Sequence, residues 1–181
     1  AFTDDIVGNV VADDGRVDST SVRVFAVDSL ALGGSELARY VWATGALYQP
    51  NFEVVPVLRL DRLGRGGDHA PFHRQGLPAL RFSERLENYK RQHLVTDDLA
   101  NVNFSYVAKV SRLNLATIVS LASAPSRPER TGYQRDRDSG GQAFRIRWDS
   151  VPGAVGYELL VRRTTDPTYG RIVRTGNVTE Y

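Results

Sequence analysis

Two short runs of this sequence combine residue types that could bind a metal ion. They read DDIVGN at residues 4–9 and GGDHAPF at residues 66–72. A carboxylate and a neutral imidazole are both natural zinc ligands. Asp5 precedes an apolar segment that ends in a glycine turn, and His69 follows two glycines that let the backbone pass close to a metal or a substrate. These two residues are therefore candidate metal ligands.

Each candidate also has an ordinary structural explanation. Asp5 would suit the end of a strand or a turn, and His69 would suit a cap or a hydrogen-bonded core position. His73 lies four residues after His69, on the same face of a helix, so a His-x3-His zinc pair is a further alternative. The sequence contains no HExxH, GxSxG or P-loop motif that would point to another chemistry.

The elements expected around these runs alternate between strands and helices, which is typical of an α/β layered domain. Hydrophobic periodicity predicts strands at 22–27, 52–60 and 77–82, and helices at 35–47, 69–75 and 99–123. Ser35 is the expected N-cap of the first helix, and Gly76 is expected to stop the second. Pro56 predicts an edge or a bulge for its strand.

The composition changes at residues 124–128 (APSRP), where two prolines and small polar residues predict a linker. Beyond the linker, apolar and polar residues alternate with a period of two, as in FRIRW at 144–148, and VPGA at 151–154 predicts a turn. We therefore expect a domain at 1–123, a linker at 124–130 and an all-β sandwich at 131–181. The last segment is short of the roughly 100 residues that such a sandwich needs, so we expect it to be incomplete.

The composition excludes several classes of protein. The 181 residues include no Cys, which excludes a disulfide scaffold, a Cys-ligated metal site and a Cys nucleophile. The net charge is +2 with acids and bases interspersed, which favours exposed arginines on strands over a nucleic-acid-binding patch. No apolar run approaches the roughly 20 residues that cross a bilayer. We expect neither a nucleic-acid partner nor a membrane span.

Taken together, the two runs and their surroundings resemble the M28 family of zinc aminopeptidases. The similarity rests on DIVGN at 5–9, DRLGRGGDHAPFHRQGLPALRFSE at 61–84, ENYKRQH at 87–93 and YVAKVSRLNLATIVSLA at 106–122. It implies that residues 1–123 are the C-terminal half of a three-layer, mixed-sheet catalytic domain. Residues 144–164 resemble the first strands of a fibronectin type III domain, with Trp148 and Tyr157 as core aromatics.

The resemblance implies a pair of zinc ions held by five side chains. Asp5 and His69 match two of these ligands, and Asp4 is the less favoured alternative to Asp5. The family's other ligands are an upstream His, a metal-bridging Asp and one member of a Glu-Glu pair, whose other member is the general base. None of these has a counterpart in this sequence, so we expect them to lie upstream of it.

Other matched residues are expected close to the metal or in the substrate pocket. Asp68 could orient the neighbouring imidazole, although a turn residue is an equal alternative. Arg81, Phe82 and Glu84 lie in a region that approaches the substrate pocket in the family, although sheet packing and surface charge are the ordinary explanation. His93 matches a His of the family that is not a metal ligand, and a surface or structural role is its ordinary explanation.

The resemblance thus implies a secreted or periplasmic zinc aminopeptidase that acts on peptides, of a kind known in bacteria with an attached fibronectin-type module. Two zinc ions would activate the water that hydrolyses the peptide bond. This chain alone is expected to be inactive, because the general base and three ligands are absent. The alternatives are a non-catalytic piece that acts in adhesion or carbohydrate binding, and carboxypeptidase-like or glutaminyl-cyclase chemistry on the same fold.

Overall fold

The structure is a computed structural model that describes residues 1–26, 33–59, 61, 66–136, 140 and 143–181. It divides into two compact units, Ala1–Ala122 and Ser123–Tyr181. The division lies next to the boundary predicted at residue 123. Among the described helices, none is both long and apolar enough to cross a membrane.

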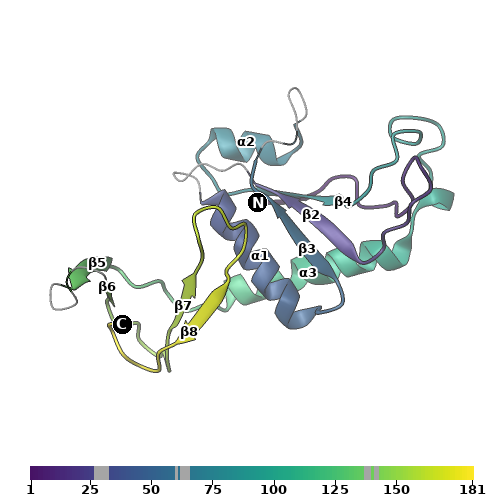
Figure 1. Cartoon of the computed structure of the whole chain (residues 1–181). Coiled ribbons are helices and arrows are strands. Elements are labelled where there is room, and N and C mark those ends of the chain that lie inside the picture. Colours follow the sequence, from purple (N-terminus) through teal and green to yellow (C-terminus); the bar gives the residue numbers. More distant parts are fainter. Residues whose placement is uncertain (27–32, 60, 62–65, 137–139, 141–142) are drawn as a thin grey trace. The chain divides into compact units, whose positions relative to one another are not determined.

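The first unit contains alternating strands and helices, as its periodicity predicted (Figure 1). In chain order its elements are β1 (Phe2–Asp4), β2 (Ser21–Phe25), α1 (Gly34–Tyr48), β3 (Glu53–Val57), α2 (His69–Arg74), β4 (Leu80–Glu84), a short 3-10 helix (Leu99–Asn101) and α3 (Phe104–Ala122). Val27 and Leu60, which were expected to end two of the strands, lie outside the described residues.

The four strands form one mixed sheet in the order β1-β4-β2-β3. β1 is parallel to β4, β4 is antiparallel to β2, and β2 is parallel to β3. Pro56 lies in β3 at an edge of the sheet, as predicted, because proline cannot donate to a second neighbour. β4 lies between β1 and β2, and all five of its residues are buried. A strand that has a neighbour on each side and is covered on both faces is expected to have all of its residues buried.

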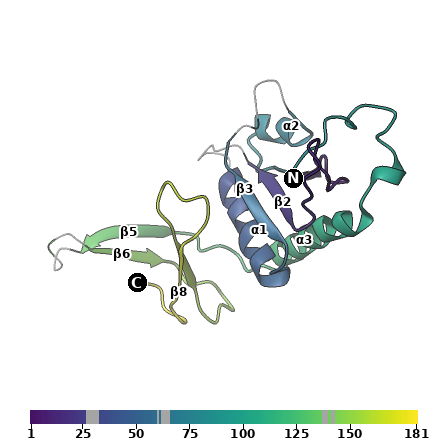
Figure 2. The same ribbon diagram turned by 45° about the vertical axis from the view of Figure 1, so that its right-hand side comes forward.

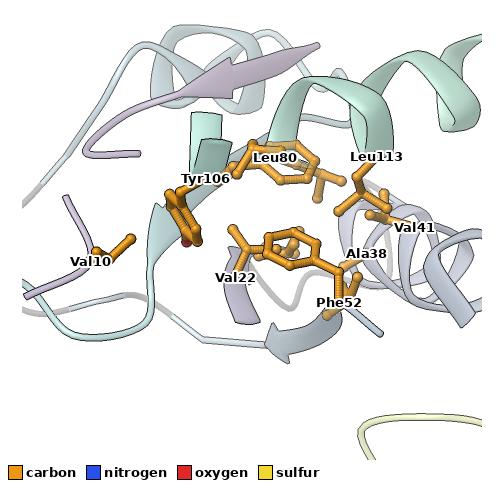
Figure 3. Packing of buried hydrophobic residues seen from close by; sticks show 13 residues of the cluster. Val10, Val22, Ala38, Val41, Phe52, Leu80, Tyr106 and Leu113 are labelled. Carbon is orange, nitrogen blue, oxygen red and sulfur yellow. The ribbon is translucent and has the colours of Figure 1, made fainter. Parts of the chain in front are cut away.

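Helices α1 and α3 lie next to each other against this sheet (Figures 1 and 2). Their buried side chains meet those of the strands in one hydrophobic core. Figure 3 shows side chains from β2, α1, β4 and α3 pointing toward one another; those labelled there include Val22, Ala38, Val41, Leu80, Tyr106 and Leu113. The hydroxyl of Tyr106 donates to the carbonyl of Ser21 at 2.8 Å, so the one polar atom of this ring is satisfied in the core.

Two helix starts differ from those predicted. Ser35 lies inside α1 and is buried, so its prediction as the N-cap is wrong. The N-cap is Gly33, whose φ of 63° is accessible to glycine at little cost. The helix expected at 99–123 begins only at Phe104, because the Asn103 side chain accepts a hydrogen bond from the Tyr106 N–H at 2.9 Å, which is how an N-cap starts a helix.

The second unit consists of paired strands. β5 (Thr131–Asp136) is antiparallel to β6 (Ala143–Trp148), and β7 (Glu158–Val161) is antiparallel to β8 (Arg171–Arg174). The predicted turn at 151–154 is present, with Gly153 at a φ of 79°. Trp148 is buried and its ring lies 5.3 Å from that of Tyr157. The fibronectin type III assignment of these strands stays a prediction.

Gly45 controls how closely α1 approaches β3 and α3, and this makes a prediction about stability. A Cβ at this position would lie 2.6 Å from Val54 Cγ2 and 3.2 Å from Leu113 Cδ1. We expect Gly45→Ala to lower the free energy of unfolding by about 1–2 kcal/mol, because overpacking outweighs the gain in helix propensity. Urea denaturation followed by the helical circular dichroism signal measures this change.

A double-mutant cycle supplies the control. Val54→Ala removes the nearest clashing methyl groups, so it should cost less free energy in the Gly45→Ala background than in the wild type. Equal costs in the two backgrounds would contradict the close packing at Gly45.

Candidate metal centre

Asp5 lies directly after β1, where the chain bends away from the sheet. Its backbone N–H donates to the carbonyl of Phe82 at 3.0 Å, which continues the pairing of β1 with β4. The next residue, Ile6, has a φ of 64°, which is a strained conformation for a β-branched residue. The carbonyl of Ile6 accepts the N–H of Glu84 at 2.7 Å. Asp5 is therefore held at a fixed bend, and strained backbone of this kind is often found at functional sites.

His69 is the first residue of α2, and its side chain is buried. Its Nδ1 atom has no hydrogen-bond partner within the described part of the chain. Burial lowers the pKa of His69, and the charges of His73 and Arg81 lower that pKa further, whereas Asp5 opposes the shift. These effects favour the neutral form of the ring, which is the form that binds a metal. A buried polar atom without a partner is uncommon in proteins, so this nitrogen is a candidate donor to a ligand.

Asp5 and His69 approach the same point of the backbone, at Gly67. A Cβ on Gly67 would lie 3.1 Å from Asp5 Oδ2, 3.0 Å from His69 Nδ1 and 3.1 Å from Arg81 Cδ. The carboxylate and the imidazole thus face one small region of space that only glycine leaves open. Two residues that are far apart in the sequence, and that were each singled out as candidate ligands, are brought together by the fold.

The sequence singled out the glycines before His69, including Gly67, but it did not single out Asp61, another member of this cluster. Arg81 is buried beside the cluster, with Nη2 at 2.7 Å from Asp61 Oδ2 and Nη1 at 3.5 Å from Asp5 Oδ2. The available signal was an acid at the start of the glycine-rich loop and an arginine in the following strand. Only the pairing of β1 with β4 shows that they meet beside Asp5.

A pocket of about 360 Å³ adjoins Asp5 on the side of the bend. Its walls include Ile6, Glu84, Asn88 and His93, so two residues predicted to lie near the substrate line the same cavity. His93 also has a positive φ, of 61°. The lining is rich in amides and carboxylates, which can form hydrogen bonds with a peptide.

Glu84 is a buried carboxylate in the wall of this pocket. Its Oε2 accepts the N–H of Asn9 at 2.9 Å, and in the described residues no Lys, Arg or His lies within ion-pair distance of its carboxylate. Burial raises the pKa of Glu84 from 4.5 to about 7, against the opposing effect of the hydrogen bonds from Asn9, while the nearby Glu87 raises it further.

Three other candidate site residues, Phe82, His73 and Asp68, do not contribute a ligand to this cluster. Phe82 belongs to the hydrophobic core, where its ring packs against Phe2, and it does not line the pocket. His73 Nε2 donates to the carbonyl of Ala79 at 2.8 Å, which disfavours the His-x3-His alternative. Asp68 occupies the N-cap position of α2 without a side-chain cap hydrogen bond, and it contributes to the electrostatic environment of His69.

The cluster contains two candidate metal donors. Within the described ranges, no group of three or more His, Cys, Asp or Glu side chains is arranged to hold a metal ion. Asp5 and His69 are donors of the right chemical type for zinc, and one of them has an unpartnered buried nitrogen. They fit two positions of a zinc site.

Comparison with known proteins finds relatives in fungi. The chain is 31% identical over 206 residues to a probable zinc metalloprotease of Pyrenophora tritici-repentis. It is 33% identical over 208 residues to a probable zinc metalloprotease of Leptosphaeria maculans, and 29% identical over 206 residues to one of Phaeosphaeria nodorum. These alignments cover 98%, 97% and 98% of this chain. The expectation of a bacterial protein is not supported, because these relatives are fungal.

The chain spans about half the length of the curated relatives it matches. The alignments cover 47%, 47% and 41% of the three relatives named above. No protein-family model matches the chain. No solved structure matches it either. The names of these relatives therefore belong to proteins that are more than twice as long as this one.

Glu84 makes a prediction about how stability depends on pH. Between pH 4.5 and about 7 the folded protein keeps a proton on Glu84 that the unfolded chain releases, so stability falls as pH rises through this window. Glu84→Gln keeps an acceptor oxygen for Asn9 and does not titrate. We expect the free energy of unfolding of the variant to rise by about 1–3 kcal/mol relative to that of the wild type between pH 5 and pH 8. Urea denaturation at several pH values measures this difference.

Glu53→Gln, at an exposed position of β3, is the matched control. It should leave the shape of the pH profile unchanged. Parallel profiles for the wild type and Glu84→Gln would contradict a titration of Glu84 in this range.

Gly67 makes a prediction about the cluster itself. A Cβ there would be close to both candidate ligands and to Arg81, whereas a Cβ on the preceding Gly66 would have no heavy atom of the described residues within 4 Å. We expect Gly67→Ala to weaken zinc binding by at least about tenfold and Gly66→Ala to leave it unchanged, because only the first displaces the donors. Titration with Zn²⁺ against a chromogenic chelator measures both affinities, and equal affinities would count against a site at Gly67.

Proposed function

We propose that this chain belongs to a zinc-dependent exopeptidase of the aminopeptidase type, similar to the M28 family, and that Asp5 and His69 are two of its zinc ligands. The observation that carries the proposal is the convergence of Asp5 Oδ2 and His69 Nδ1 on the open side of Gly67. The names of the fungal relatives, probable zinc metalloproteases, support zinc and proteolysis. The peptidase-like fold of the first unit and the fibronectin-like fold of the second are part of the same proposal.

The donor set supports zinc over harder cations. Imidazole nitrogen and carboxylate oxygen are a usual pair at catalytic zinc sites, whereas Mg²⁺ and Ca²⁺ prefer oxygen alone. His69 is buried with Nδ1 unpartnered, so a zinc ion would satisfy a donor that otherwise carries a desolvation cost. When bound, zinc ions at this site would polarise the peptide carbonyl and lower the pKa of a water molecule.

The residues of this chain would perform three tasks around that chemistry. Asp5 and His69 would hold the metal. The pocket beside Asp5 would receive part of the peptide, with the ring of His93 available for hydrogen bonds. The strained bend at Ile6 would keep the carboxylate of Asp5 and the pocket wall in a fixed relation.

We further propose that these 181 residues alone do not hydrolyse peptides. A pair of zinc ions requires more donors than Asp5 and His69, and the described part of the chain offers no group of three. A general base beside the metal-bound water is needed as well. No residue near His69 takes that role by resemblance to the family.

Zinc titration of site variants tests the proposal. We expect the chain to bind a single zinc ion weakly, and Asp5→Ala and His69→Ala each to abolish detectable binding. Isothermal titration calorimetry measures the stoichiometry and affinity, and aminoacyl-anilide hydrolysis measures activity. We expect no turnover by the chain alone.

The chain offers a matched control beside each ligand. Asp4→Ala removes the neighbouring carboxylate, which accepts hydrogen bonds from Asn114, and His73→Ala removes the neighbouring imidazole. Both should retain zinc. Undiminished binding in Asp5→Ala and His69→Ala would refute the ligand assignment, and two bound zinc ions with turnover would refute the predicted inactivity.

A further inference from the structure

Arg81 is a charged side chain buried at the centre of the sheet, next to the two proposed ligands. β4 places it between Thr3 of β1 and Phe25 of β2. Only 1% of its surface is exposed. Removing a guanidinium from water is unfavourable unless opposite charges and hydrogen-bond acceptors surround it. The groups that compensate Arg81 are therefore under a strong structural constraint.

The compensating groups come from separate segments of the chain. Nη2 donates to Asp61 Oδ2 at 2.7 Å, and Nη1 donates to the carbonyl of Gly66 at 3.0 Å. The guanidinium also lies 4.7 Å from the centre of the Phe25 ring, a cation–π contact. Asp61 and Gly66 both belong to the loop that leads to His69. A single side chain on β4 thus contacts both Asp61 and Gly66.

The two carboxylates near Arg81 are not equivalent. Asp61 is within hydrogen-bond distance at 2.7 Å, whereas Asp5 Oδ2 is 3.5 Å from Nη1, close enough for attraction but beyond a good hydrogen bond. The geometry assigns the closer contact to Asp61 and leaves the oxygens of Asp5 available.

We propose that Arg81 and Asp61 act as a positioning pair for the metal centre. Arg81 ties the end of β1, with Asp5, to Asp61 and Gly66, which precede His69 and α2, and Asp61 keeps the guanidinium from forming a full ion pair with Asp5. This inference rests on the proposed function, because it assumes that Asp5 and His69 bind zinc. Neither Arg81 nor Asp61 is itself a ligand.

Loss of Asp61 has a specific expected consequence. Without its closest carboxylate, the guanidinium would turn to Asp5 and form the two-point pair that arginine makes with carboxylates. The oxygens of Asp5 would then be occupied by N–H donors. Asp61→Asn should therefore weaken zinc binding at Asp5 although Asp61 does not touch the metal.

The experiment compares Asp61→Asn and Arg81→Lys with a matched pair elsewhere in the same unit. Arg23 of β2 pairs with the buried Glu87, and Glu87 does not line the pocket, so Glu87→Gln breaks a similar ion pair away from the proposed ligands. Zn²⁺ affinity is measured by competition with a chelator, and the visible spectrum of bound Co²⁺ reports the geometry of the ligands. Melting temperatures without metal report stability separately.

We expect zinc affinity to fall by at least about tenfold in Asp61→Asn and Arg81→Lys, with altered Co²⁺ bands, as for other groups that orient ligands. Glu87→Gln should change the zinc affinity less than about twofold, even if its melting temperature falls as much as those of the other two variants. If the zinc affinity fell in proportion to the melting temperature in all three variants, Arg81 and Asp61 would have only a structural role. That result would overturn the inference. Absence of zinc binding by the wild type would instead overturn the proposed function, and the inference with it.

Discussion

The buried positive charge of Arg81 is the constraint on which the candidate metal centre depends. A guanidinium in the middle of a sheet must be compensated, and the compensating carboxylates can come only from segments that pass close to β4. β1 supplies one of them at its end and the loop before α2 supplies the other. The need to neutralise one arginine therefore draws together the two parts of the chain that carry the candidate ligands.

Glycine at position 67 completes this arrangement by leaving space. The backbone passes so close to Asp5, His69 and Arg81 that no other residue fits without displacing one of them. The strained φ of Ile6 contributes to the same cluster from the end of β1, since it turns the chain immediately after Asp5. Packing, charge and backbone conformation thus act on the same few atoms.

Local signals in the sequence predicted the parts of the fold that depend on neighbouring residues. Pro56 indicated an edge strand, Gly76 indicated the end of α2, and the turn at 151–154 followed from its proline and glycine. The prediction of Ser35 as a helix cap was wrong, because Gly33 can take the left-handed conformation two residues earlier.

The candidate site was predictable only in part, for a physical reason. Asp5 and His69 could be singled out because their residue types have an intrinsic chemistry. The ion pair of Arg81 with Asp61 and the burial of Glu84 arise from strand order, which no local pattern encodes. Phe82, expected near the substrate, is a core residue because the alternation of β4 turns it toward Phe2.

The strand order also bears on when the site can form during folding. β1 pairs with β4, the last strand of the sheet in the sequence, and not with β2, which follows it directly. The partner of β1 thus follows β2, α1, β3 and α2 in the sequence, so their pairing closes a long stretch of chain. Such long-range closure is slow, since the loop entropy is lost before the contact is gained. We therefore expect a metal ion that needs both Asp5 and His69 to bind only after β1 has paired with β4, and not to guide that pairing.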